Sequence, residues 1–336
     1  GAVLNNLAGG IINDTTTAAS PLEGNGTPST FVNTGNFNKN AGSAATQSFS
    51  INAFANSGSF NVNAGSFQLT SGGTDTGTYT IGAGTTLAVT AGTRSFNGTS
   101  FTGSGALGLT GGTMDFATST TFLAGGPTLS LTGGTVSGIG NLTVNSALTL
   151  GGTTFNGAGG GSFNTSGTTT LNGSPSFNGA VTWNNSGTVD IGGGDRILMY
   201  NGAVLNNLAG GIINDTTTAT SPLEGNGSAS TFVNAGSFNK NAGSAATQSF
   251  SITGSTNAAG GVFNVNAGTF QTSAAFIQSG ALNVGSGAVL NTGGLNLTNG
   301  STGVIGGSGT VDLGAGTLTN NGVISPGVGA GNTATL

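Results

Sequence analysis

FVNTGNF, residues 31–37, is a copy of a seven-residue motif, here called the phrase, that recurs along the chain. The phrase begins with an aromatic or aliphatic residue, carries Asn (once Gln) at its third position and Gly at its fifth, and ends on an apolar residue. Successive glycines of the phrase lie 23 residues apart at Gly35 and Gly58. Repeats of this length are typical of solenoids, whose units bury their apolar faces only by stacking on neighbours. Further copies are FANSGSF (54–60), WNNSGTV (183–189), FVNAGSF (232–238), FIQSGAL (276–282) and LTNNGVI (318–324).

A much longer repeat contains these phrases. Residues 1–51 recur as residues 202–252 with only five differences. We therefore expect one continuous solenoid over residues 1–336, made of a first module at 1–201 and a second, incomplete copy at 202–336. Because the sequence begins inside a repeat, we also expect it to be a portion of a longer chain.

The residue types predict strands rather than helices. Of 336 residues, 67 are Gly and only 4% are charged, and Thr, Val, Ile and Phe dominate the apolar runs. Runs such as TYTI (78–81) and TVDI (188–191) alternate at period two, as half-buried strands do. Leucine-rich repeats share this repeat length, but their Leu framework is missing. The sequence predicts an all-β fold, a parallel β-helix with turns of about 19–25 residues.

Stacked turns of such a fold place equivalent side chains above one another. We expect Phe37 with Phe60, and Phe238 with Phe263, to form ladders of rings. Four asparagines are predicted to occupy ladder or turn positions rather than ligand contacts: Asn13, Asn33, Asn214 and Asn234.

One segment resembles a known group of proteins. GVIGGSGTVDLGAGTLTNNGVISPG (303–327) is similar to the strand repeats of bacterial autotransporter passengers and filamentous-haemagglutinin-like adhesins, and residues 101–114 and 138–152 share its style. The resemblance implies a right-handed parallel β-solenoid outside a bacterial cell, and it implies no catalytic residue. The resemblance does not extend to the anchoring or secretion domain of those families, so it implies no export route.

The residues offer little for catalysis, and we expect no enzyme and no catalytic residue. His and Cys are absent, which removes the common zinc, thiol and triad arrangements. Paired carboxylates are the remaining option. Asp14 with Glu23 recurs in the second copy as Asp215 with Glu224. This recurrence favours a structural role in each copy over a single active site. The other acids are Asp75, Asp115, Asp190, Asp195 and Asp312.

No metal or cofactor is predicted either. GGGDRILMY (192–200) approaches a calcium-binding nonapeptide, but its Asp stands two positions early and no second copy follows. We interpret Asp195 and Arg196 as turn residues. Asp14 and Asp215 are expected to accept hydrogen bonds from their own backbone in Asx-turns rather than to bind a cation.

Composition also argues against two classes of partner. The basic residues number four, Lys39, Arg94, Arg196 and Lys240, and the net charge is −5, so nucleic-acid binding is not expected. No window approaches about 18 uninterrupted apolar residues, so no membrane span is predicted.

The leading functional hypothesis is a structural extracellular fibre or adhesin stalk, a rod on the bacterial surface that extends axially into a filament. Its partner would be a second copy of itself, by axial continuation or end-to-end stacking, with possible lateral bundling. The alternative is a glycan-binding adhesin module that contacts cell-surface or matrix polysaccharide. In that case Trp183, Tyr79 and Tyr200 would stack on sugar rings.

Overall fold

Short parallel strands build the fold, because Gly and Asn interrupt most apolar runs after three or four residues. The computed structural model describes residues 1–25, 28–116, 118–138, 141–226, 229–272 and 276–327, and these residues form no helix. Each strand pairs in parallel with a strand one turn away, so the chain is a parallel β-solenoid of about 14 turns. The all-β solenoid prediction is confirmed.

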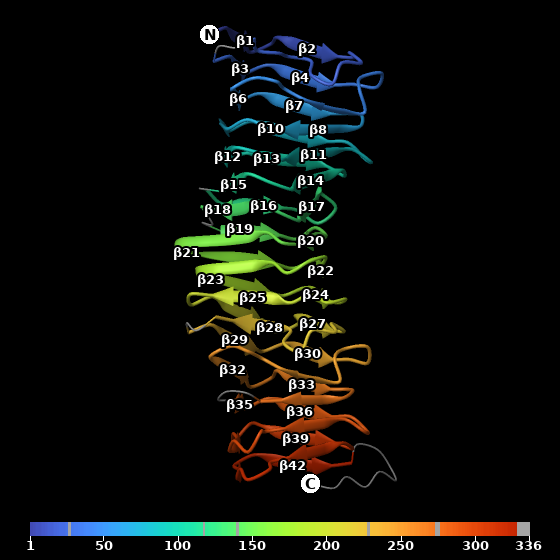
Figure 1. Cartoon of the computed structure of the whole chain (residues 1–336), viewed down its shortest axis with the longest axis vertical. Helices are drawn as coiled ribbons and strands as arrows, with labels where there is room; N and C mark the ends of the chain where they lie inside the picture. The colour runs from blue at the N-terminus through green and yellow to red at the C-terminus, as the bar shows by residue number, and fades with distance from the viewer. Residues whose placement is uncertain (26–27, 117, 139–140, 227–228, 273–275, 328–336) are drawn as a thin grey trace. The chain divides into compact units, whose positions relative to one another are not determined.

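The chain divides into two compact units, Gly1–Ser162 and Phe163–Leu336. The start of the repeated sequence at Gly202 lies inside the second unit, so the duplication and the compact units divide the chain differently. Strand β21 (Thr154–Thr165) contains the boundary between the units. Figure 1 shows that within each unit the turns follow one another in chain order.

In the first unit most turns contribute three strands, one to each face. The first face holds β1 (Val3–Asn6), β3 (Thr30–Asn33), β6 (Ala53–Asn56), β9 (Gly73–Asp75), β12 (Thr93–Phe96), β15 (Thr113–Asp115) and β18 (Thr135–Ser137). The second holds β2 (Ile11–Asp14), β4 (Asn36–Lys39), β7 (Ser59–Val62), β10 (Thr78–Ile81) and β13 (Ser100–Gly103). Strands β16 (Thr120–Phe122) and β19 (Asn141–Val144) pair with each other and belong to the sheet that contains the first face. The third holds β5 (Thr46–Ser48), β8 (Ser66–Leu69), β11 (Thr86–Val89), β14 (Ala106–Leu109), β17 (Thr128–Leu131) and β20 (Leu148–Leu150).

The second unit repeats this arrangement. Its first face holds β23 (Ser176–Asn185), β26 (Val204–Asn207), β29 (Thr231–Asn234), β32 (Gly254–Asn257), β35 (Phe276–Gln278), β38 (Leu297–Asn299) and β41 (Leu318–Asn320). Its second holds β22 (Thr168–Leu171), β24 (Thr188–Ile191), β27 (Ile212–Asp215), β30 (Ser237–Lys240), β33 (Val262–Val265), β36 (Ala281–Val284), β39 (Val304–Gly307) and β42 (Val323–Pro326). The remaining strands are β25 (Ile197–Tyr200), β28 (Leu223–Gly225), β31 (Thr247–Ser249), β34 (Thr269–Gln271), β37 (Val289–Asn291) and β40 (Thr310–Asp312).

Turn length varies slightly more than the sequence predicts. Paired residues are separated by 19 positions at Val262 and Ala281, and by 27 positions at Val3 and Thr30. The upper limit of 25 residues is therefore wrong. The long turns carry a loop after β2 or β27, which lengthens the connection without changing the pairing of the strands.

Alternation along each strand sends every second side chain inward. In β3 and β6 the inward positions are Phe and Asn, and they are buried. The ring ladders predicted from the sequence are confirmed. Phe37 stacks on Phe60 with ring centroids 4.8 Å apart, and Phe238 stacks on Phe263 at the same distance. These rings form the apolar interior of their turns.

An inner ladder of asparagine side chains runs beside the rings. In the first unit, the side-chain amide of Asn6 donates to Asn33 Oδ1 (2.7 Å), and Asn33 donates to Asn56 Oδ1 (2.8 Å). Each Nδ2 also donates to a backbone carbonyl, so Asn33 and Asn56 both donate and accept. The ladder of the second unit comprises Asn185, Asn207, Asn234, Asn257 and Gln278, joined by bonds of 2.8–2.9 Å.

The recurring Gly of the phrase lies where the backbones of successive turns approach closely. A Cβ added at Gly58 would lie 2.2 Å from the carbonyl oxygen of Gly35, and one at Gly236 would lie 2.2 Å from that of Gly211. A side chain of any size would push the turns apart. The Gly is therefore required by stacking.

We predict that Asn234→Ala destabilises the second unit by about 1–3 kcal/mol, because it leaves buried amide and carbonyl partners without hydrogen bonds. The measurement is urea unfolding followed by the fluorescence of Trp183, the single tryptophan, which is buried in this unit. Asn239→Ala is the matched control, because Asn239 also joins two turns through its amide but is half-buried. Equal losses for the two variants would contradict the importance of the inner ladder.

Candidate functional site

The same buried constellation occurs once in each copy of the repeat. It combines an acid, a lysine and a glutamine: Asp14, Lys39 and Gln47 in the first unit, and Asp215, Lys240 and Gln248 in the second. In each case the acid and the lysine are cross-strand partners on neighbouring turns. All six side chains are at most 5% exposed.

Hydrogen bonds hold each member of the second copy in place. Asp215 Oδ1 accepts from the backbone N–H of Thr217 (3.0 Å), and Asp14 Oδ1 accepts from that of Thr16 (2.9 Å). The predicted Asx-turns are therefore confirmed. The Lys240 ammonium donates to Ser244 Oγ (2.7 Å) and the Ala245 carbonyl (2.9 Å) rather than to the carboxylate.

Two buried oxygens of this constellation have no hydrogen-bond partner. They are Asp215 Oδ2 and Gln248 Oε1, and the equivalent atoms of Asp14 and Gln47 share this state. The amide nitrogen of Gln248 donates to the Thr217 and Ala219 carbonyls, at 3.1 and 3.0 Å, which fixes the orientation of the side chain. An unpartnered buried carboxylate oxygen disfavours the charged form.

Burial raises the pKa of Asp215 to about 6, against the opposing effects of the Thr217 N–H, Gln248 and the Lys240 charge. Burial also lowers the pKa of Lys240, partly offset by Asp215, and that of Lys39, partly offset by Asp14. Asp215 can thus exchange a proton near neutral pH. Because the side chain is buried, a change in its protonation changes the stability of the fold.

A second buried charge cluster lies in the first unit. Arg94 pairs with Asp75 through two guanidinium nitrogens, and Arg94 Nη1 donates to the Phe54 carbonyl (2.6 Å). Its guanidinium carbon lies 5.0 Å from the centre of the Phe54 ring. Asp75 also accepts from the backbone N–H of Asn56 (2.9 Å), so the ion pair continues the inner ladder where the asparagines end.

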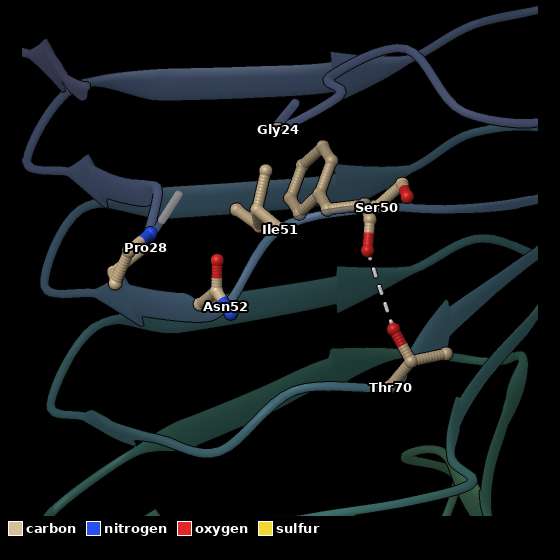
Figure 2. A pocket seen from close by; sticks show the side chains of 7 residues that line it. Gly24, Pro28, Ser50, Ile51, Asn52 and Thr70 are labelled. Carbon is tan, nitrogen blue, oxygen red and sulfur yellow. Dashed lines mark hydrogen bonds between the residues drawn. The ribbon is translucent and has the colours of Figure 1, made fainter. Parts of the chain in front are cut away.

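A cavity of about 500 Å³ opens beside Gly24 and Pro28. Figure 2 shows Pro28, Asn52 and Thr70 around it. These polar groups already have partners, since Asn52 Oδ1 accepts from the Ser29 N–H (2.9 Å) and Thr70 Oγ1 donates to the Phe49 carbonyl (3.3 Å). Among the described residues that line the cavity, none has a titratable side chain, so these residues offer hydrogen bonds but no acid or base.

The other acids lie apart in the fold. Asp115 is half-buried between Ser95 and Ser137, whose hydroxyls donate to it at 3.1 and 3.3 Å. Glu224 pairs with Arg196 at 2.5 Å on the surface of the second unit. Among the described residues no group of three or more acids is placed to hold a metal ion.

The sequence-predicted turn and ladder residues are where we expected them. Asn33 and Asn234 belong to the inner ladder, while Asn13 and Asn214 accept from Asn38 and Asn239 in ladders on the outer surface. The backbone N–H of Asp195 closes a turn on the Gly192 carbonyl (3.1 Å).

The glycan-binding alternative predicts that Trp183, Tyr79 and Tyr200 stack on sugar rings. Trp183 and Tyr79 are at most 1% exposed, so that interpretation is wrong for both. Tyr200 is half-buried. No helix among the described residues has the length and apolarity that a membrane span needs.

Sequence reasoning did not single out Lys39, Lys240, Gln47, Gln248 or Arg94 as buried. A signal was present for all five, since Gln47 and Gln248 also precede a buried Phe by two positions. Lys39 follows Phe37 by two positions, Lys240 follows Phe238 likewise, and Arg94 precedes Phe96 by two, so each shares the inward face of its strand.

We predict that the second unit gains stability as the pH falls from 7 to 5. The pKa of Asp215 is about 6 in the folded state and 3.8 in the ordinary carboxyl group, so the folded state binds the proton more tightly. The gain is about 1–2 kcal/mol, and it should disappear in Asp215→Asn. Urea unfolding monitored by Trp183 fluorescence tests this, with Asp190→Asn, a half-buried acid on the neighbouring turn, as control. A pH dependence that survives in Asp215→Asn would contradict the assignment.

We predict that Arg94→Leu destabilises the first unit by about 3–5 kcal/mol, because it leaves Asp75 charged and buried without its partner. Adding Asp75→Asn should recover part of the loss, since Asn still accepts from the Asn56 N–H. Hydrogen exchange of residues 53–96, read by mass spectrometry, reports both changes. Failure of the second substitution to restore protection would show that the loss arises from packing alone.

Comparison with known proteins gives a match among the solved structures. No family model matches the chain, and no curated protein matches its sequence. The matched structure is a TibC-catalysed, hyper-glycosylated fragment of TibA, 15% identical, with a TM-score of 0.32 over 98% of each chain. The fold of the present chain is the parallel β-solenoid that the resemblance to autotransporter passengers implied.

Proposed function

We propose that this chain is a structural protein, a fibre or adhesin stalk outside a bacterial cell, and that it has no catalytic activity. The observation that carries the proposal is the repetition of the same turn-to-turn contacts. Asn6, Asn33 and Asn56 bond to one another as Asn207, Asn234 and Asn257 do. A module joined by such contacts adds length without any new kind of interaction.

The chemistry of the interior supports the same proposal. Groups whose pKa is shifted by burial, among them Asp215, Lys240 and Tyr79, are inaccessible, and they contact protein atoms. An active site needs such groups at a surface where a substrate can reach them. In this chain the buried groups stabilise the interior, and Asp215 makes its stability depend on pH.

Glycan binding is the second candidate, and the cavity beside Pro28 is the observation that favours it. Its polar lining and its volume of about 500 Å³ suit a sugar unit. The buried positions of Trp183 and Tyr79 weigh against stacking of sugar rings on those residues.

Electron microscopy of native material tests the proposal. A module of nine or ten turns, each about 4.8 Å along the axis, predicts fibres with an axial repeat of about 45 Å. Incubation with plant, algal and bacterial polysaccharides should release no new reducing ends or unsaturated products. Discrete particles that bind glycans would favour the second candidate. Turnover abolished by replacing Asp14 or Asp215 would overturn the structural function.

A further inference from the structure

Tyr200 is unusual among the aromatic residues because its ring points away from the interior. The chain has 19 Phe, two Tyr and one Trp, and of these only Tyr200 and Phe276 are half-buried rather than buried. Tyr200 occupies an outward position of β25, where it alternates with the buried Met199. Strand β25 pairs with β23 on one side and with β28 on the other. The exposure of Tyr200 therefore does not result from a strand edge without a neighbour.

Two side-chain amides border Tyr200. Asn178 of β23 is its cross-strand partner, and the amide of Asn201 donates to Asn178 Oδ1 (2.7 Å). Asn201 has a φ of 54°, the one positive φ of a residue other than Gly in the described part of the chain. Asn tolerates this left-handed conformation better than most residues do. Because Gly202 also has a positive φ, of 88°, the backbone turns directly after Tyr200 and keeps both amides beside it.

An accessible ion pair borders the same strand. Glu224 of β28 is the cross-strand partner of Leu198, the other outward residue of β25. Arg196 Nη1 donates to Glu224 Oε2 (2.5 Å), and the two side chains are 40% and 34% exposed. Asp195, the residue before Arg196, is half-buried. These side chains form one group, here called the Tyr200 patch: Asn178, Arg196, Leu198, Tyr200, Asn201 and Glu224.

The Tyr200 patch combines the chemical groups that recognise a sugar. A tyrosine ring offers an apolar face to the C–H groups of a pyranose, and its hydroxyl group remains a hydrogen-bonding partner. The amides, the guanidinium and the carboxylate around it can exchange hydrogen bonds with sugar hydroxyls. Arg196 and Glu224 neutralise each other, and Asp195 adds a negative charge to a chain whose net charge is already −5. A neutral sugar therefore suits the patch better than an acidic one.

We propose that the Tyr200 patch binds a pyranose unit of a neutral polysaccharide, with the sugar ring stacked on Tyr200. Sugar hydroxyls on one side of the ring contact the amides of Asn178 and Asn201, and those on the other side contact the Arg196–Glu224 pair. This inference rests on the second candidate function, glycan binding, and places the contact at the Tyr200 patch rather than in the cavity beside Pro28. A shallow site of this kind binds weakly, with a Kd of about 1 mM for a short oligosaccharide.

Nuclear magnetic resonance of the tyrosine rings tests the contact directly, because the chain has only two tyrosines and Tyr79 is buried. The full chain is prepared with isotope-labelled tyrosine, and Tyr200→Phe identifies which ring signal belongs to which residue. The probes are cellohexaose and chitohexaose, with an oligogalacturonate as the anionic comparison. At least one neutral probe should shift the Tyr200 signal and leave the Tyr79 signal in place. The anionic probe should shift neither signal.

Substitutions in the full chain separate ring stacking from the polar contacts. Tyr200→Ala should weaken binding of the neutral probe by about tenfold or more, whereas Tyr200→Phe should change it by less than about threefold, because Phe keeps the face of the ring. Glu224→Gln replaces a charged acceptor by a neutral one, so binding should weaken by about threefold. Asp312→Asn is the matched control, because it removes an exposed acid outside the patch and should leave binding unchanged. Urea unfolding followed by Trp183 fluorescence shows that each variant is folded.

A Tyr200 signal that none of the neutral probes shifts, an equal shift by the anionic probe, or a folded Tyr200→Ala variant that binds as tightly as wild type would each overturn this inference. Binding that is lost in Asn52→Ala but kept in Tyr200→Ala would also overturn it, and would leave glycan binding to the cavity. A chain that binds none of the probes contradicts both the inference and the second candidate function. The structural function fails separately, by the absence of fibres in native material.

Discussion

In-register stacking of like side chains is the constraint on which the rest of the structure depends. Each parallel pairing places a residue above its counterpart one turn away, so Asn33 meets Asn56 and Phe37 meets Phe60. A carboxamide is suited to this position because it donates to one neighbour and accepts from the other. The close approach at Gly58 follows from the same stacking.

Much of this architecture was predictable from the phrase that recurs with Asn at its third position and Gly at its fifth. Its period indicated a solenoid, and its repetition indicated that Phe and Asn stack from turn to turn, although not which of the asparagines point inward. The 27-residue turns were not predictable, because the length of an excursion after β2 does not affect the pairing that defines the repeat. The alternation of the strand places Lys39, two positions after Phe37, on the inward face. Because lysine is seldom buried, its residue type argued against that prediction.

The distribution of charge separates this chain from ordinary globular proteins. Of 13 charged residues, six are at most 5% exposed: Asp14, Lys39, Asp75, Arg94, Asp215 and Lys240. Uncharged polar side chains form part of the surface. There the side-chain amide of Asn264 donates a hydrogen bond to Asn239 on the neighbouring turn. Because such ladders satisfy neighbouring amides with one another, the outer face is held by the same kind of contact as the interior.

The buried acid and lysine also resolve an ambiguity that near-identical turns create. A chain built of similar phrases is open to slippage, in which a turn stacks on the wrong neighbour with little loss of apolar contact. Asp215 lies between Ile191 and Lys240, and Lys240 lies between Asp215 and Val265. A slip by one turn would bury a charge against aliphatic side chains alone, at a cost of several kcal/mol. Each acid–lysine pair thus favours a single register of pairing between the turns of its copy of the repeat.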